Sequence, residues 1–180
     1  PLVLFFSILT SCGDLSTDPL TAISADKAII DENGLKAAIN GAYNEIQSAA
    51  ISQDITIAAD LAADNLIHRG SKKEYREISD NNILPSNAYI EGIWNRSYNA
   101  INQVNLVLEV IPDLTTVSTA VRNEQEAQAR FIRAFCYFNL VRFFGPVPYK
   151  EASTSGATNE ELFIGRSSVD SIYSFIINCL

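Results

Sequence analysis

The 180-residue chain contains no methionine, one histidine and three cysteines. A single histidine, His68, excludes metal centres built from several imidazoles, and without a Cys-x-x-Cys pair or Cys/His cluster we expect no zinc site. A Ser-His-Asp triad would have to use His68, for which a solvated loop position is the simpler interpretation. No Gly-x-Ser-x-Gly turn or phosphate-binding glycine loop is present. We therefore predict no enzyme, no catalytic residues, no metal and no cofactor.

Basic residues are also scarce. Lysine and arginine total 13 against 21 acidic residues, which gives a net charge of −8 and a pI of about 4.6. Such an acidic surface repels phosphate backbones, so we expect no nucleic-acid partner. The hydrophobic content of 47% is enough for one core of ordinary size.

The apolar run at residues 2–9 (LVLFFSIL) is far too short for a bilayer, which needs about 20 apolar residues, but it suits a signal-peptide core. Thr10 and Ser11 before Cys12 match a lipoprotein cleavage site, and polar residues follow. We predict a truncated signal peptide at 1–11, lipid on Cys12, a tether over 12–30 and an incomplete helical domain over 31–180. The alternatives are an ordinary signal peptide or a strand with a chance cysteine.

Both ends of the sequence suggest a piece of a longer protein, because the chain starts without methionine inside an apolar run and stops inside a helical pattern. The other two cysteines are Cys136 and Cys179. Cys136 stands among aromatic residues, which predicts a buried free thiol. A disulfide between the two stays open.

Helical periodicity dominates the rest of the chain. Amphipathic stripes predict helices from Leu35 after a capping Asp31, over about 89–111, over about 120–144, and from Ser167 or Ser168 onwards. Residues 51–67 fit a helix or a helix–strand mixture. No other segment alternates like a strand, so the predicted fold class is all-α, with helical hairpins packed in a TPR-like way but without the 34-residue repeat.

The two middle helices are expected to contact each other through small and aromatic residues. The predicted contact residues are Trp94 and Tyr98 on one helix and Ala127, Phe131, Ala134 and Phe138 on the other, whose apolar stripe continues to Val141. Stacking of Trp94 and Tyr98 on a sugar is the alternative to their place in the core. Arg130 and Arg133 are expected on the helix surface or an interface, with Glu126 paired to Arg130, rather than binding an anion.

Residues 68–87 show no clear period, which predicts a long loop. Cationic, amide and aromatic groups on such a loop can bind hydroxyl-rich ligands. The candidate ligand-binding residues are Arg69, Lys72, Lys73, Tyr75, Asn81, Asn82 and Tyr89. Asp60 and Asp64 would be four residues apart on a helix and could hold calcium or act as a glycosidase pair, but a solvated face is the simpler interpretation.

Several segments resemble the N-terminal part of the SusD/RagB family of nutrient-binding outer-membrane lipoproteins. The residues that carry the resemblance are Gly41-Ala42-Tyr43, Trp94-x3-Tyr98-x2-Ile101-x3-Asn105, Ala129-Arg130-Phe131-Ile132-Arg133-Ala134, Phe138, Leu140-Val141, Phe144-Gly145, Val147-Pro148 and Arg166-Ser167-Ser168 with Ile172-Tyr173 and Ile176. They stand in the family's order over nearly the whole chain. Gln128, Pro146 and Cys179 depart from the acidic residues common at those positions.

The resemblance implies a SusD-like, non-catalytic lipoprotein of the outer membrane, held by its N-terminal lipid and facing the cell exterior. It implies binding of glycans or other oligomeric nutrients and their delivery to a SusC-type TonB-dependent β-barrel transporter. Family members are longer, so the motif residues here are interpreted as scaffold. Two other interpretations stay open: a helical scaffold lipoprotein that binds only proteins, and a lipid-anchored hydrolase that uses acidic residues.

Overall fold

The computed structural model describes residues 29–154 and 163–180. In chain order the elements are α2 (Glu32–Gln47), the π-helical turn η1 (Ala50–Asp54), α3 (Ile55–Ala62), α4 (Lys73–Ser79), α5 (Ala88–Val110), the 3₁₀ turn η2 (Ile111–Asp113), α6 (Thr119–Phe144), β1 (Val147–Pro148), β2 (Arg166–Ser167) and α8 (Val169–Cys179). The predicted all-α class is confirmed, and the described residues add only one pair of two-residue strands.

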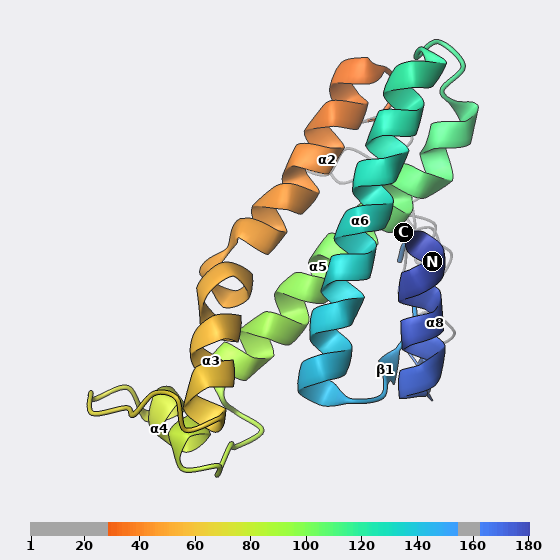
Figure 1. Ribbon diagram of the computed structural model, residues 1–180. Coiled ribbons are helices and arrows are strands. Elements are labelled where there is room, and N and C mark those ends of the chain that lie inside the picture. Colours follow the sequence, from red (N-terminus) through yellow and green to blue (C-terminus); the bar gives the residue numbers. More distant parts are fainter. Residues whose placement is uncertain (1–28, 155–162) are drawn as a thin grey trace, which may run out of the picture.

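Four helices, α2, α5, α6 and α8, form what we call the bundle (Figure 1). α5 packs between α2 and α6, and α8 packs on α6. Apolar residues at helical spacing supply the core, for example Leu35, Ile39 and Ala42 of α2, which are almost completely buried. Ile29, inside the segment predicted as a tether, is also buried in this core.

Side-chain caps fix where the helices begin. The Asp31 carboxylate accepts a hydrogen bond from the Gly34 amide at 2.8 Å, and the Ser168 hydroxyl accepts one from the Ser171 amide at 3.2 Å. The predicted cap at Asp31 is confirmed, and Ser168 rather than Ser167 caps the last helix. Gly145, with a φ of +65°, ends α6 in a conformation that favours glycine. β1 then pairs with β2, which brings the chain back to α8.

The second region, which we call the distal lobe, consists of residues 50–87, which include η1, α3 and α4. It lies at the far end of α5 from α8 (Figure 1). The residues predicted as an uninterrupted loop contain α4, so that prediction is wrong over Lys73–Ser79. Seven residues present only two buried positions, Tyr75 and Ile78, which is too few to show a period. Residues 51–62 are helical throughout, counting η1 and α3 together.

The contact stripe predicted for α6 is only partly correct. Ala134 and Val141 are buried, but Ala127, Phe131 and Phe138 lie on the exposed side. The residues that fill the core from α6 are instead Ala129, Ile132, Cys136, Tyr137 and Leu140. The error has a physical cause, because α6 is apolar on more than one side and periodicity alone does not say which side is covered.

Arg130 and Arg133, the two α6 arginines considered in the sequence, differ in their surroundings. Arg130 pairs with Glu126 at 2.7 Å near the surface, as predicted. Arg133, expected on a surface or interface, is buried and donates hydrogen bonds to the Asn105 amide oxygen at 3.0 Å and the Cys179 sulfur at 3.5 Å. Its guanidinium also lies 5.0 Å from the Phe175 ring centroid. The prediction that Arg133 lies on a surface or interface is therefore wrong, because Arg133 is buried and bonded to Cys179.

Cys136 and Cys179 are both free and buried, so the open question of a disulfide is answered in the negative for this structure. Burial raises the pKa of the Cys136 thiol to about 12, as expected for a structural cysteine. Cys12, the predicted signal peptide 1–11 and most of the predicted tether lie outside the described residues. Among the described residues, no helix is long and apolar enough to cross a bilayer.

Candidate functional site

An aromatic stack forms where the distal lobe meets α5. The rings of Tyr75, from α4, and Tyr89, from the first turn of α5, stack with centroids 4.4 Å apart and planes inclined by 16°. The Lys72 ammonium lies 5.0 Å from the Tyr75 centroid and 5.4 Å from the Tyr89 centroid, within cation–π range. Three residues of the predicted ligand-binding set therefore meet at one place.

Tyr75 is fixed by a hydrogen bond to Asp54, a residue that was not among the candidates predicted from the sequence. Its hydroxyl donates a hydrogen bond to the Asp54 carboxylate at 3.0 Å, and both residues are buried. Burial, and then the Asp54 carboxylate, raises the pKa of the Tyr75 hydroxyl. Because its hydroxyl is already bonded and its ring is covered, Tyr75 serves to position Tyr89.

Asn87 joins α4 to α5. Its side-chain oxygen accepts hydrogen bonds from the amides of Tyr89 and Ile90 at 3.2 and 3.3 Å, which caps α5. Its side-chain nitrogen donates to the Glu74 carbonyl at 3.0 Å and the Glu77 carboxylate at 2.8 Å. Asn87 was not among the residues predicted from the sequence, although an asparagine directly before an apolar helical stripe is a cap signal.

The other predicted residues, Arg69, Lys73, Asn81 and Asn82, are exposed on the same lobe. No hydrogen bond among the described residues links their side chains to the aromatic stack. Asn81 has a φ of +51°, the left-handed conformation that asparagine tolerates well, and it marks the end of the α4 turn. The structure therefore leaves these side chains free to face solvent around the stack.

His68 is half-buried rather than fully solvated. Its ring meets the Tyr75 ring edge-on, with centroids 5.6 Å apart and planes inclined by 71°. Its Nε2 atom is buried and has no hydrogen-bond partner among the described residues. His68 therefore contributes to packing of the distal lobe.

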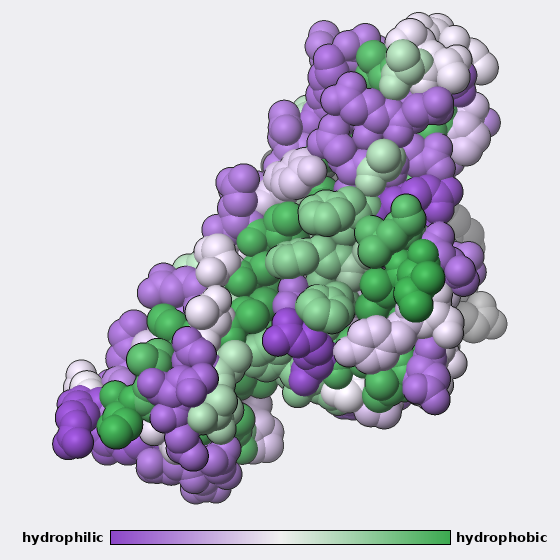
Figure 2. All heavy atoms as spheres, viewed as in Figure 1, coloured by the Kyte–Doolittle hydropathy of each residue, from purple (hydrophilic) through white to green (hydrophobic). Residues whose placement is uncertain are grey.

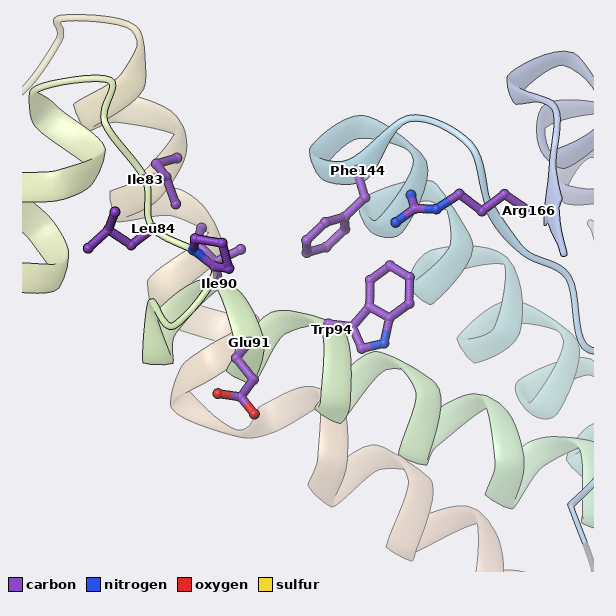
Figure 3. Close-up of a pocket in the computed structure, with 8 residues that line it drawn as sticks. Ile83, Leu84, Ile90, Glu91, Trp94, Phe144 and Arg166 are labelled. Atoms are coloured by element: carbon purple, nitrogen blue, oxygen red, sulfur yellow. The ribbon is translucent and has the colours of Figure 1, made fainter. Parts of the chain in front are cut away.

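A shallow groove of about 390 Å³ lies between residues 83–85 and the end of α6 (Figure 3). Its lining residues are Ile83, Leu84, Pro85, Ile90, Glu91, Trp94, Phe144 and Arg166. Trp94 meets Phe144 edge-on at 5.0 Å, and the Arg166 guanidinium lies 5.8 Å from the Trp94 ring. The groove is mostly apolar, with one carboxylate and one guanidinium at its edges.

Trp94 and Tyr98 both pack against the bundle core, as the simpler interpretation predicted. Their centroids are 4.9 Å apart, and the Tyr98 hydroxyl donates to the Pro148 carbonyl at 2.7 Å. Burial is the main cause that raises the pKa of Tyr98. Tyr98 is therefore structural, whereas Trp94 packs on the core and also lines the groove.

The acidic pair proposed for calcium or hydrolysis does not form on one helix. α3 ends at Ala62, and Asp64 follows it with a φ of 58°. Asp60 accepts a hydrogen bond from the Asn65 side chain at 3.4 Å. Across residues 29–154 and 163–180, no group of three or more His, Cys, Asp or Glu side chains is placed to hold a metal ion.

Comparison with known families gives a match over most of the chain. The profile of a SusD-like family, described as "Starch-binding associating with outer membrane", matches residues 16–180. SusD-like protein P2 of Formosa agariphila is 26% identical over 174 residues, which are 94% of this chain and 34% of that protein. A SusD-like protein of Bacteroides ovatus is 30% identical over 93 residues, 51% of this chain and 17% of the relative.

Solved structures show the same fold. The surface glycan-binding protein A from Bacteroides uniformis superimposes with a TM-score of 0.70 at 22% identity, over 82% of this chain and 33% of that one. A SusD superfamily protein from Bacteroides fragilis superimposes with a TM-score of 0.69 at 20% identity, over 84% of this chain and 38% of that one. At these identities the likeness establishes the fold. The chain spans about a third of the length of these relatives.

Proposed function

The chain belongs to the SusD-like family described as starch-binding and associated with the outer membrane, and on that basis we propose that the complete protein binds glycans or related oligomeric nutrients at the cell surface. The family match over residues 16–180 is the observation that carries the proposal. The complete protein then delivers its ligand to a SusC-type TonB-dependent β-barrel and breaks no bond. Lipid on Cys12 holds it at the outer membrane, facing the exterior.

We assign the contribution of this chain to ligand binding to the exposed side of the distal lobe. The apolar face of a sugar ring fits an aromatic face, and Tyr89 offers a half-buried ring fixed by its stack on Tyr75. Lys72, Arg69, Asn81 and Asn82 supply cationic and amide donors for hydroxyl groups around it. Tyr75, although in the predicted set, acts through Tyr89 because it is buried.

A matched pair of triple variants of the complete protein tests this assignment. K72A/N81A/N82A removes one lysine and two asparagines of the distal lobe, and K36A/N44A/N95A removes the same residue types from exposed positions of the bundle. Titration calorimetry with a panel of soluble oligosaccharides should show that the first variant loses at least about tenfold in affinity, roughly 1.4 kcal/mol. The control should bind like the parent. Equal binding by both variants would remove the distal lobe from the ligand site.

The anchor and the partner have separate tests. Replacing Cys12 with alanine should abolish lipid labelling and release the protein from the membrane fraction, whereas unchanged retention would refute the anchor. Purification of the tagged complete protein from outer membranes in mild detergent should recover a stoichiometric large β-barrel. Recovery of the protein alone would favour a scaffold that binds other proteins.

A further inference from the structure

The distal lobe carries three neighbouring cations beside the aromatic stack. Arg69, Lys72 and Lys73 are all exposed, and we call these three residues the basic segment. No acidic residue occurs from residue 65 to residue 73. Figure 2 shows mostly hydrophilic side chains over this lobe, at the lower left of the view. The charges of the basic segment therefore belong to an exposed and polar surface.

The basic segment forms no ion pair within the part of the chain that the structure describes. Acidic residues outnumber basic ones by 21 to 13, so an exposed cation has many carboxylates with which it could pair. Arg76, the next cation of the lobe, donates a hydrogen bond to the Gly70 carbonyl at 3.3 Å and not to an acid. The ion pairs of the described residues all lie in the bundle and are Lys36–Glu32, Arg96–Glu45 and Arg130–Glu126.

Two acids of the lobe are bonded within the protein. Asp54 is buried and accepts the Tyr75 hydroxyl, and Glu77 accepts the side-chain amide of Asn87 at 2.8 Å. The other acids of the lobe are Asp60, Asp64, Glu74 and Asp80. Charges farther away than about 8 Å are largely screened at physiological ionic strength. The net charge of −8 therefore acts weakly on a ligand at the stack, where the adjacent cations act strongly.

Lys72 lies beside the stack and leaves the outer face of Tyr89 to a ligand. Its ammonium is 5.0 Å from the Tyr75 centroid and 5.4 Å from the Tyr89 centroid, and the two centroids are 4.4 Å apart. Because the first two distances are nearly equal, the ammonium is at the side of both rings and not over the outer face of either. A sugar ring stacked on Tyr89 would therefore bring its edge, which carries its substituents, toward this ammonium.

We propose that the glycan bound by the complete protein is acidic, with carboxylate or sulfate groups that the basic segment binds beside the Tyr89 ring. This inference rests on the proposed function, because it names the class of glycan bound at the same site. Hydrogen bonds from a cation to an anionic oxygen are shorter and roughly twice as strong as those to a neutral hydroxyl. The Arg69 guanidinium can also bind both oxygens of a carboxylate or sulfate at once.

Matched pairs of oligosaccharides test the charge of the ligand. The probes for titration calorimetry on the complete protein are an oligogalacturonate with its carboxyl-reduced form, and a sulfated galactan oligosaccharide with its desulfated form. In at least one pair, the acidic member should bind at least about tenfold more tightly than the neutral member at low salt, and its affinity should fall as salt is raised. The pair that binds distinguishes carboxylate from sulfate.

The other outcomes separate this inference from the proposed function. Equal or tighter binding of the neutral members would overturn the inference and leave glycan binding in place. Affinity for the acidic member that does not change with salt would also overturn it, because an exposed charge contact is screened by salt. No binding to these pairs or to the oligosaccharide panel described above would contradict the proposed function, and the inference with it.

Two double variants of the complete protein locate the charge contact. R69Q/K72Q removes one arginine and one lysine of the basic segment, and K36Q/R130Q removes the same residue types from the bundle, where each is paired with a glutamate. Both variants lose two positive charges. R69Q/K72Q should bind the acidic member at least about tenfold more weakly, with little effect on the neutral member, and K36Q/R130Q should bind like the parent. An equal loss for the acidic and neutral members would contradict the inference, because the cations would then act only as donors to hydroxyl groups.

Discussion

The bundle and the distal lobe are held together in different ways. The bundle buries a continuous apolar core from four helices, with Tyr137 and Leu140 at its centre. The distal lobe buries a much smaller cluster of Ala58, Leu61, Tyr75 and Ile78. Polar contacts through Asp54 and Asn87 join that cluster to its surroundings. Regions with few buried apolar contacts open at lower free energy, and ligand-binding segments are commonly drawn from them.

The first prediction compares the two cores directly. L140A removes a fully buried side chain of the bundle and should lower the free energy of unfolding of the complete protein by about 2–5 kcal/mol. I78A removes an equally buried side chain of the distal lobe and should instead open only that lobe. Hydrogen exchange resolved by segment should show faster exchange throughout α2, α5 and α6 for L140A, and in α3 and α4 alone for I78A. Faster exchange in α6 of I78A would contradict the expectation that the distal lobe opens without the bundle.

Alkaline pH should weaken the bundle more than the lobe. Burial raises the pKa of Tyr98 and Tyr137 in the bundle and of Tyr75 in the lobe. The folded state therefore keeps protons that the unfolded state releases above about pH 10, so stability is complete below that pH and falls as pH rises further. Each such tyrosine can lower the free energy of unfolding by up to about 1.4 kcal/mol for every pH unit above about 10. Chemical denaturation at pH values from 9 to 11 should show that the free energy of unfolding falls less steeply with pH in Y137F than in the parent protein. The same slope in both proteins would contradict this prediction.

Removing one hydroxyl should affect only the distal lobe. Y75F leaves the buried Asp54 carboxylate without its tyrosine donor and should destabilise the lobe by about 1–3 kcal/mol. Y43F changes a half-buried tyrosine that packs on the bundle core and should have little effect. Exchange rates in α4 provide the measurement. If both variants behaved alike, the Tyr75–Asp54 bond would not be what holds α4 in place.

Removal of one helix cap in each region compares the distal lobe with the bundle again. N87A should lower stability by about 0.5–2 kcal/mol through loss of the α5 cap, and it also removes the two bonds to α4. S118A removes the cap of α6, whose hydroxyl accepts from the Val121 amide at 3.4 Å. Chemical denaturation followed by exchange should place the N87A effect in both α4 and α5, but the S118A effect in the first turn of α6 only.

The smallest effect belongs to the bundle surface. E126A removes the Glu126–Arg130 ion pair and should change stability by only about 0.2–0.5 kcal/mol, less still in high salt. Denaturation midpoints at low and high salt measure this. A loss comparable with that of L140A would mean that surface charge, and not the apolar core, stabilises the bundle.

Local signals explain what could be predicted. The stripes of α2, α5 and α8 and the caps at Asp31 and Ser168 depend on nearest neighbours along the chain, so their spacing was enough. α4 was missed because a seven-residue helix is marginal alone and forms only with Tyr75 and Ile78 packed against α3 and α5. For the candidate site, the sequence supplied Lys72, Tyr75 and Tyr89 as residue types, but not their stack or the buried partner Asp54.

The sequence by itself determined the long helices of the bundle, the caps at Asp31 and Ser168 and the family, because these rest on residue order and short-range spacing. Only the tertiary structure decided which side of α6 is covered, since that helix is apolar on two sides and the choice depends on where α2, α5 and α8 pack. It also decided that Arg133 is buried, because Asn105 and Cys179 reach it from other helices. Contacts between residues far apart in the chain leave no local pattern from which they can be predicted.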